Sequence, residues 1–223
     1  SAPLNSNLKT VMDFSFFDKI NTAKNEQTET WFKGLDRVYN NFVYDFLYPD
    51  PTSVLAFIEN HDTDRFLGEG DNLPMLKQAS TLLLTTRRIP QLYYGTEIMM
   101  NGVKSKSDGY VRKDFPGGWS DDKANALTAA GRTKLQNECY NFYKTLLNWR
   151  KGNEVIAKGN MTQFMVQHGV YAYARQYNGK TVFVMLNGTD EATTLPLKYY
   201  KEILKDHAQG KDILTGRIIN LDG

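Results

Sequence analysis

A histidine and an aspartate, His61 and Asp62, stand side by side shortly after the continuous apolar run Val54–Ile58. An imidazole can exchange protons near neutral pH, and a carboxylate can act as a base or accept hydrogen bonds from hydroxyl groups. Two interpretations of this pair are open. It belongs to a catalytic or ligand-binding site, or it is a helix-capping aspartate beside a hydrogen-bonded loop histidine.

Further polar and aromatic candidates follow along the chain. Asp108 and Arg112, four residues apart, offer an acceptor and a fork of donors to a ligand rich in hydroxyl groups, or they form a salt bridge within a loop. Arg65 either orients a carboxylate or packs as a charge at a helix start. Tyr94 and Trp119 carry rings that line a cleft or fill a core.

Parallel strands would bring such residues to one edge of a sheet. The run Val54–Ile58 does not alternate and is bounded by turn residues, which is typical of a strand buried on both faces. A helix is predicted over Leu73–Thr86, with Asn72 as its cap and Pro74 in its first turn. Ile89–Tyr94 is the next predicted strand. The order strand, helix, strand indicates βαβ units, in which functional residues follow the carboxyl ends of the strands.

Weaker patterns predict the elements before and after these units. Leu8–Phe14 is predicted as a short strand, and a helix follows because apolar residues recur at helical spacing. These apolar residues are Trp31, Leu35, Val38, Phe42 and Phe46. The Gly- and Asp-rich stretch Met99–Leu127 is a long loop of a kind that is usually functional. A further helix is predicted over Gly131–Lys151.

The sequence pattern changes near Gly152 from helical spacing to short strand-like runs, and we place a domain boundary there that separates residues 1–152 from residues 153–223. Beyond it, Val170–Arg175 and Thr181–Leu186 are predicted strands, and Asn178-Gly179 between them is a strong hairpin signal. An antiparallel β domain is therefore expected. No final strand is evident before Gly223, which suggests a domain that is cut short. His168 and His207 in this part are interpreted as structural or solvated.

Composition excludes several classes of protein. The 223 residues carry a formal net charge of +2 and include 41% hydrophobic residues, without a basic stripe that would indicate nucleic acid. No apolar run reaches the roughly 18 residues of a membrane span. The single cysteine, Cys139, suggests a buried inert thiol and no zinc site. The polar start Ser1–Asn7 does not resemble a signal peptide, and its missing Met suggests a piece of a longer protein, so localisation is left open.

Three segments together resemble the α-amylase superfamily of glycoside hydrolases. They are Phe57–Arg65 with its Asn-His-Asp motif, Pro90–Glu97 with Tyr-Tyr-Gly-x-Glu, and Asp108–Trp119 with Arg-Lys-Asp-Phe-Pro-Gly-Gly-Trp. Their order and spacing are similar to the neopullulanase and cyclomaltodextrinase branch, over roughly residues 8–150. The resemblance implies an α/β fold: a partial (β/α)₈ TIM barrel, strands six to eight, followed by the antiparallel β domain.

The same resemblance implies roles for individual residues. Asp62 matches the third catalytic carboxylate, which binds and distorts the sugar at the bond to be cleaved, and His61 matches the histidine that bonds hydroxyls of that sugar. Asp108 and Arg112 match the residues that bind the next sugar toward the non-reducing end. Such hydrogen bonds strengthen in an oxocarbenium-like transition state. The other substrate-binding candidates are Arg65, Tyr94 and Trp119.

A retaining glycosidase needs two further carboxylates, a nucleophile and a general acid, and neither family motif precedes Asn60. The chain alone is therefore expected to be inactive. It is expected to bind α-glucan oligosaccharides and to self-associate or pair with the missing half of the barrel, because three strands leave open edges. No cofactor or metal is assigned, since calcium sites would lie largely in the missing half. A full-length enzyme of a bacterial starch-utilisation system would be periplasmic or extracellular.

Two other interpretations compete with an enzyme segment. In the first, the chain is a non-catalytic carbohydrate-binding or interaction module that keeps His61 and Asp62 only as ligands. In the second, it is a different parallel-sheet enzyme in which the pair performs acid–base chemistry on a phosphate or carbonyl group. A phosphate substrate would favour a Gly-rich loop after a strand, and the sequence contains none.

Overall fold

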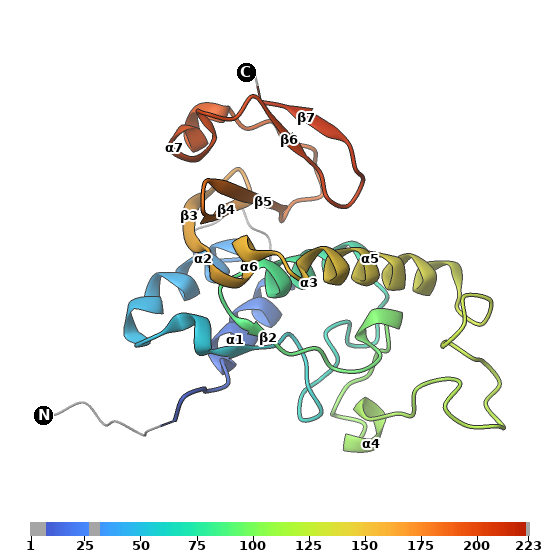
Figure 1. Cartoon of the computed structure of the whole chain (residues 1–223). Coiled ribbons are helices and arrows are strands. Elements are labelled where there is room, and N and C mark those ends of the chain that lie inside the picture. The colour runs from blue at the N-terminus through green and yellow to red at the C-terminus, as the bar shows by residue number, and fades with distance from the viewer. Residues whose placement is uncertain (1–7, 27–31, 222–223) are drawn as a thin grey trace, which may run out of the picture.

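A computed structural model describes residues 8–26 and 32–221 and shows helices surrounding short parallel strands, followed by antiparallel sheets (Figure 1). The first part contains α1 (Phe14–Ala23), α2 (Leu35–Val43), β1 (Leu55–Ala56), α3 (Leu73–Thr85), β2 (Ile89–Pro90), α4 (Asp108–Val111) and α5 (Lys134–Arg150). The second part contains α6 (Glu154–Lys158), β3 (Asn160–Gln167), β4 (Val170–Tyr177), β5 (Lys180–Asn187), α7 (Lys201–Leu204), β6 (Gln209–Lys211) and β7 (Ile218–Asn220). The 3₁₀ turns η1 to η4 of the described residues cover Tyr44–Leu47, Pro51–Ser53, Thr96–Ile98 and Leu197–Tyr200.

The first part is organised by three neighbouring segments that run parallel. Leu55 of β1 pairs with Ile89 of β2, and an isolated parallel bridge joins Met12 to Leu55 on the other side. Backbone hydrogen bonds from Asp13 N to Leu55 O (2.7 Å) and from Gln91 N to Ala56 O (2.8 Å) hold this arrangement. The predicted parallel pairing is confirmed, although the ladder of β1 and β2 is only two residues long.

The predicted strand Leu8–Phe14 is wrong beyond the bridge at Met12, because α1 already begins at Phe14. The side chain of Asp13 accepts a hydrogen bond from Phe16 N (2.8 Å) and so caps the helix. The helix expected from the spacing of Leu35 onward is α2, but it ends at Val43 and gives way to the turn η1. Trp31, which was assigned to that helix, lies outside the described residues.

The two long helices lie where the sequence predicts them, and both carry side-chain caps. Asn72 accepts from Met75 N (3.0 Å) at the start of α3. Thr133 and Gln136 form a reciprocal capping box at the start of α5. The two helices pack together through buried faces, where the Ser80 and Tyr143 hydroxyl groups hydrogen-bond to each other.

The second part is built on the antiparallel sheet β3-β4-β5. The predicted hairpin between β4 and β5 is confirmed, because Asn178 (φ 48°) and Gly179 (φ 73°) both have the positive φ of a type I′ turn. The sequence interpretation missed β3 and the terminal hairpin of β6 and β7, so the expectation of no final strand is wrong.

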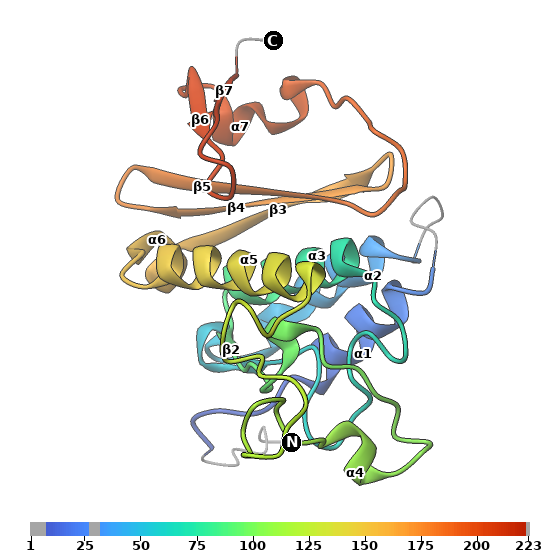
Figure 2. The same ribbon diagram turned by 90° about the vertical axis from the view of Figure 1, so that its right-hand side faces the viewer.

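Figure 2 shows the sheet of β3–β5 as a layer, with α2, α3, α5 and α6 on one side and α7 with the β6–β7 hairpin on the other. Tyr171 and Tyr173 of β4 point to one face and join the same core cluster as Leu82 of α3 and Phe42 of α2. Residues of the opposite face pack against α7 and the turn before it. Because Tyr171 and Tyr173 belong to the core of the first part, that core extends across the boundary expected near Gly152, while the other face of the sheet has a cluster of its own.

A buried arginine also joins the two parts. Arg175 of β4 is 1% exposed and donates hydrogen bonds to Thr85 O (2.8 Å) at the end of α3 and to Ile156 O (2.9 Å) in α6. Burial lowers the pKa of Arg175 to about 10. The carbonyl groups at a helix carboxyl end attract a cation, so Arg175 satisfies groups that the helix leaves unpaired.

Candidate functional site

The turn after β1 presents His61 and Asp62 to solvent. Asn60 is buried, and its side-chain oxygen accepts from Asp62 N (2.8 Å), while Asn60 N donates to the hydroxyl of Thr63 (3.0 Å). Such a side-chain-closed turn fixes the backbone locally. The side chains of His61 and Asp62 are 61% and 59% exposed and lie together, with His61 Nε2 3.1 Å from Asp62 Oδ2.

Arg112 brings the two predicted pairs into one cluster. Its Nη2 atom lies 2.9 Å from Asp62 Oδ1 and 3.2 Å from Asp108 Oδ2, and its Nε donates to His61 O (2.8 Å). The structure therefore joins His61 and Asp62 with Asp108 and Arg112, although 50 residues separate Asp62 from Arg112. The loop salt bridge that was the alternative for Asp108 and Arg112 also exists, and Asp62 is its third member.

The short helix α4 determines where the second pair lies. Ser107 caps this helix by accepting from Tyr110 N (3.1 Å), which places Asp108 in the first turn and Arg112 immediately after the last residue. Figure 2 shows α4 at the end of the molecule opposite the antiparallel sheets. Because His61 and Asp62 follow β1 in the chain, the cluster lies near the carboxyl end of β1.

Lys104 is a fifth member of the cluster that the sequence interpretation missed. Its Nζ donates to Asp62 O (3.0 Å) and lies 3.5 Å from Asp108 Oδ1, and its backbone N donates to Asp64 Oδ1 (2.6 Å). Its spacing of four residues before Asp108 is not a signal by itself, because such pairs meet regularly only on a helix, and Lys104 lies in a turn before α4. We call His61, Asp62, Lys104, Asp108 and Arg112 the polar cluster.

The aromatic candidates are placed differently. The Tyr94 hydroxyl donates to Lys113 O (2.6 Å), and its ring is 4.7 Å from that of Tyr93. Tyr94 thus links the loop after β2 to the segment after α4. Trp119 is 64% exposed, and its backbone N donates to the Asp122 carboxylate (3.1 Å) within the same loop.

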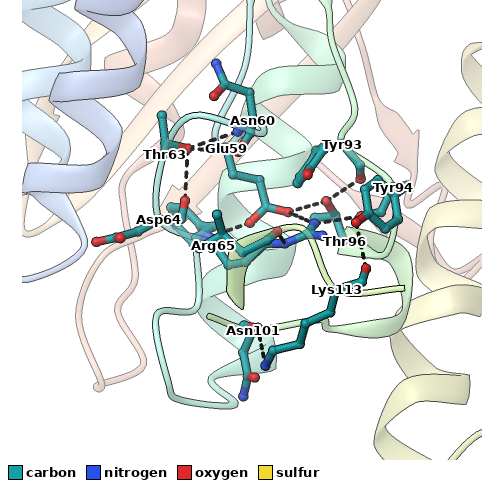
Figure 3. Close-up of polar contacts among 12 residues, drawn as sticks. Glu59, Asn60, Thr63, Asp64, Arg65, Tyr93, Tyr94, Thr96, Asn101 and Lys113 are labelled. Carbon is teal, nitrogen blue, oxygen red and sulfur yellow. Dashed lines mark hydrogen bonds and ion pairs between the residues drawn. The ribbon is translucent and has the colours of Figure 1, made fainter. Parts of the chain in front are cut away.

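The prediction that Arg65 contacts substrate disagrees with its burial. Arg65 is 1% exposed, and its Nη1 lies 3.2 Å from Oε1 of Glu59, which is also buried (Figure 3). A group so enclosed does not reach a ligand at the surface. The alternative interpretation, that Arg65 orients a carboxylate, agrees with this pairing. Burial raises the pKa of the Glu59 carboxyl group, whereas its hydrogen bonds to Thr96, Phe66 N and Arg65 act in the opposite direction.

Several features bear on other kinds of site. Within residues 8–26 and 32–221, no three His, Cys, Asp or Glu side chains are grouped so that they would hold a metal ion. None of the helices in that part of the chain is long and apolar enough to cross a bilayer. Cys139 is buried as predicted, and burial raises the pKa of its thiol to about 12, so it is a poor nucleophile.

Known proteins are similar to this chain in both sequence and fold. Residues 161–223 match the domain family described as the cyclo-malto-dextrinase C-terminal domain. An α-amylase of Niallia circulans is 28% identical over 214 residues, which are 92% of this chain and 37% of that protein. A cyclomaltodextrin glucanotransferase of Thermoanaerobacterium thermosulfurigenes is 30% identical over 211 residues, 91% of this chain and 27% of that protein. The chain thus spans well under half the length of these curated relatives.

Solved structures agree with the sequence matches at the level of the fold. An α-amylase from Geobacillus thermoleovorans, solved in complex with acarbose, superimposes with a TM-score of 0.72 at 21% identity. The match covers 96% of this chain and 44% of the α-amylase chain. A cyclomaltodextrinase superimposes with a TM-score of 0.60 at 19% identity, and the match covers 80% of this chain and 28% of the cyclomaltodextrinase chain. Sequence matches, the matching domain family and the shared fold lead to one assignment. The chain belongs to the α-amylase family of glycoside hydrolases, family 13, and corresponds to a C-terminal portion of these proteins.

Proposed function

We propose that this chain supplies part of the sugar-binding cleft of a retaining glycoside hydrolase that acts on α-glucans. The observation that carries the proposal is the Arg112 guanidinium group, which joins Asp62 and Asp108 at the surface. Carboxylates and a guanidinium fork, close together and open to solvent, are suited to the hydroxyl groups of neighbouring sugar rings. Relatives named as α-amylase and as cyclomaltodextrin glucanotransferase support an α-glucan as the ligand.

Each member of the polar cluster has a role in this proposal. Asp62 accepts hydrogen bonds from hydroxyls of the sugar at the bond to be cleaved, and His61 bonds that same sugar. These contacts strengthen as the ring flattens toward the oxocarbenium-like state. Asp108 and Arg112 hold the next sugar toward the non-reducing end. Because the ion pairs among these side chains are exposed, exchanging them for sugar hydroxyls costs little.

In this proposal, hydrolysis of the glycosidic bond also requires two groups that other parts of the full protein supply. A nucleophile and a general acid would come from other strands of a (β/α)₈ barrel, and the segments at Met12, β1 and β2 would be its strands six to eight. Residues 1–152 would then complete the barrel and residues 153–223 would form its C-terminal β domain. The full protein would belong to the neopullulanase and cyclomaltodextrinase branch, with any calcium bound outside this chain.

Titration of the chain with maltotriose, followed by NMR, tests this proposal. We expect wild-type binding, and we expect Asp62→Asn or Arg112→Met to weaken it about tenfold, because hydrogen bonds to charged groups contribute roughly 1.5 kcal/mol or more. Lys158→Met is the matched control, since Lys158 forms an exposed pair with Glu154 in α6 (2.7 Å).

Two results would contradict the proposal. Unchanged binding in both cluster variants would remove Asp62 and Arg112 from the site. Release of sugar from starch, pullulan or cyclomaltodextrin by the purified chain, abolished by Asp62→Asn, would show that the chain is catalytically complete by itself.

A further inference from the structure

Beneath the polar cluster lies a buried ion pair whose arginine contacts every loop that contributes to the cluster. Arg65 and Glu59 are 1% and 2% exposed and lie at the two ends of the turn that carries His61 and Asp62. Phe66 N and the Thr96 hydroxyl both donate to the Glu59 carboxylate, which closes the turn and connects it to η3 (Figure 3).

Arg65 extends these connections to three further backbone positions. Its Nη1 donates to Tyr94 O (2.6 Å), its Nε donates to Val111 O (3.0 Å), and its backbone N donates to Gly102 O (3.0 Å). Val111 is the residue before Arg112, and Gly102 is two residues before Lys104. Through its side chain and its own backbone N, Arg65 thus touches the backbone near each part of the polar cluster.

The guanidinium plane of Arg65 is fixed by rings as well as by hydrogen bonds. Its Cζ atom lies 4.0 Å from the centre of the Tyr93 ring and 4.9 Å from that of Tyr94. Arginine is suited to this place because its donors are arranged in a rigid fork and its plane stacks on aromatic rings. Lysine has the charge but cannot bond three carbonyl and carboxylate oxygens in these directions.

We infer that Arg65, held by Glu59, is a positioning residue that keeps Asp62, Lys104 and Arg112 at the spacing that two neighbouring sugars require. The inference rests on the proposed function of the polar cluster. A buried ion pair adds little to stability compared with apolar side chains of similar volume, so stability alone does not account for it. A site whose exposed groups come from three loops needs buried support of this kind.

The test separates positioning from stability by replacing both members of the pair. Arg65→Met alone leaves Glu59 buried without its partner and is expected to unfold part of the chain. The double variant Glu59→Gln/Arg65→Met removes both charges and is expected to recover most of the stability. Arg175→Met is the matched control, because Arg175 is equally buried but donates to backbone carbonyls near α6.

Maltotriose affinity of the folded fraction and amide hydrogen exchange are measured for each protein. We expect the double variant to bind roughly tenfold more weakly or worse, because small displacements of positioned groups are costly, with faster exchange at residues 60–64, 94–98 and 108–112 together. We expect Arg175→Met to lose stability while its affinity stays within about twofold of wild type, since its partners lie outside the polar cluster.

Recovery of both wild-type affinity and wild-type exchange in the double variant would overturn the inference and leave Arg65 a purely structural residue. Failure of the wild-type chain to bind maltotriose would refute the proposed function instead. The exchange data would still decide the positioning role, because they need no ligand: acceleration confined to the residues next to Arg65 would also overturn it.

Discussion

Lys104 contacts the backbone carbonyl of Asp62 and the carboxylate of Asp108 from a turn before α4. Its ammonium group reaches the backbone of Asp62 at 3.0 Å and the side chain of Asp108 at 3.5 Å, and 42% of its side chain is exposed. A cation in this place partly neutralises Asp108 and adds donors where a sugar hydroxyl would lie. Lys104 therefore belongs with Arg112 among the residues that would select a ligand.

Replacing Lys104 by methionine tests this role. We expect Lys104→Met to weaken maltotriose binding by up to about fivefold, because an exposed charged contact contributes up to roughly 1 kcal/mol. Lys104→Arg keeps the charge and should retain most of the affinity. Calorimetric titration measures both, and stronger binding by Lys104→Met would show that the ammonium group hinders the ligand.

At the scale of elements, a charged clip holds the start of α2 beside the end of α1. Arg37 of α2 donates to both oxygens of Glu26 (2.6 Å each), and Gly34 N donates to the same carboxylate (2.9 Å). The hydrogen bonds from Arg37 lower the pKa of Glu26 to about 2 from its ordinary value of 4.5. The two helices also meet through the rings of Phe16 and Phe42, whose centres are 5.9 Å apart.

The depressed pKa of Glu26 predicts an acid-sensitive contribution to stability. Its folded-state pKa lies below the unfolded value, so the contribution is complete above about pH 4.5 and is lost as the pH falls toward 2. We expect Glu26→Gln to lower the free energy of unfolding by on the order of 1 kcal/mol at pH 6 and by much less near pH 2, since solvent screens this pair.

Urea unfolding across this pH range measures the difference, and Arg37→Met should remove the same pH dependence. A difference between wild type and Glu26→Gln that does not change with pH would show that the clip is not ionic in origin.

At the scale of the whole molecule, apolar side chains remain exposed around the parallel segments. Val11 and Met12 lie on one side of β1, and Ile89 and Leu92 lie on the other; each is at least 39% exposed. Short open edges with apolar neighbours are sites where further strands pair. In the (β/α)₈ barrel proposed above, further strands of that barrel would occupy these edges.

These edges predict that the isolated chain self-associates. Sedimentation velocity should show a larger species that grows with protein concentration, and Ile89→Lys should shift the equilibrium toward monomer, because a charge at an exposed edge position opposes strand pairing. Lys158→Met, remote in α6, serves as the control. A wild-type chain that stays monomeric up to high concentration would contradict this prediction.

Local patterns in the sequence were sufficient for elements that their own residues stabilise. The apolar spacing and caps of α3 and α5 predicted both helices, and Asn178-Gly179 predicted its hairpin, since each signal acts within a few residues. The strand β3 was missed because its polar residues hide the alternation, and only pairing with β4 makes it a strand. Likewise Asp13 ends the first parallel segment by capping α1, which a continuous apolar pattern conceals.

By itself, the sequence determined the family and named His61, Asp62, Asp108 and Arg112, because residue types in order and spacing are local properties of the chain. Tertiary structure alone decided that Arg65 is buried beneath these residues and that Lys104 stands beside them. The physical reason is that burial, and the distances between residues of different loops, depend on how the parallel strands bring loops some 50 residues apart in sequence to one side of the sheet. No short stretch of sequence contains that geometry.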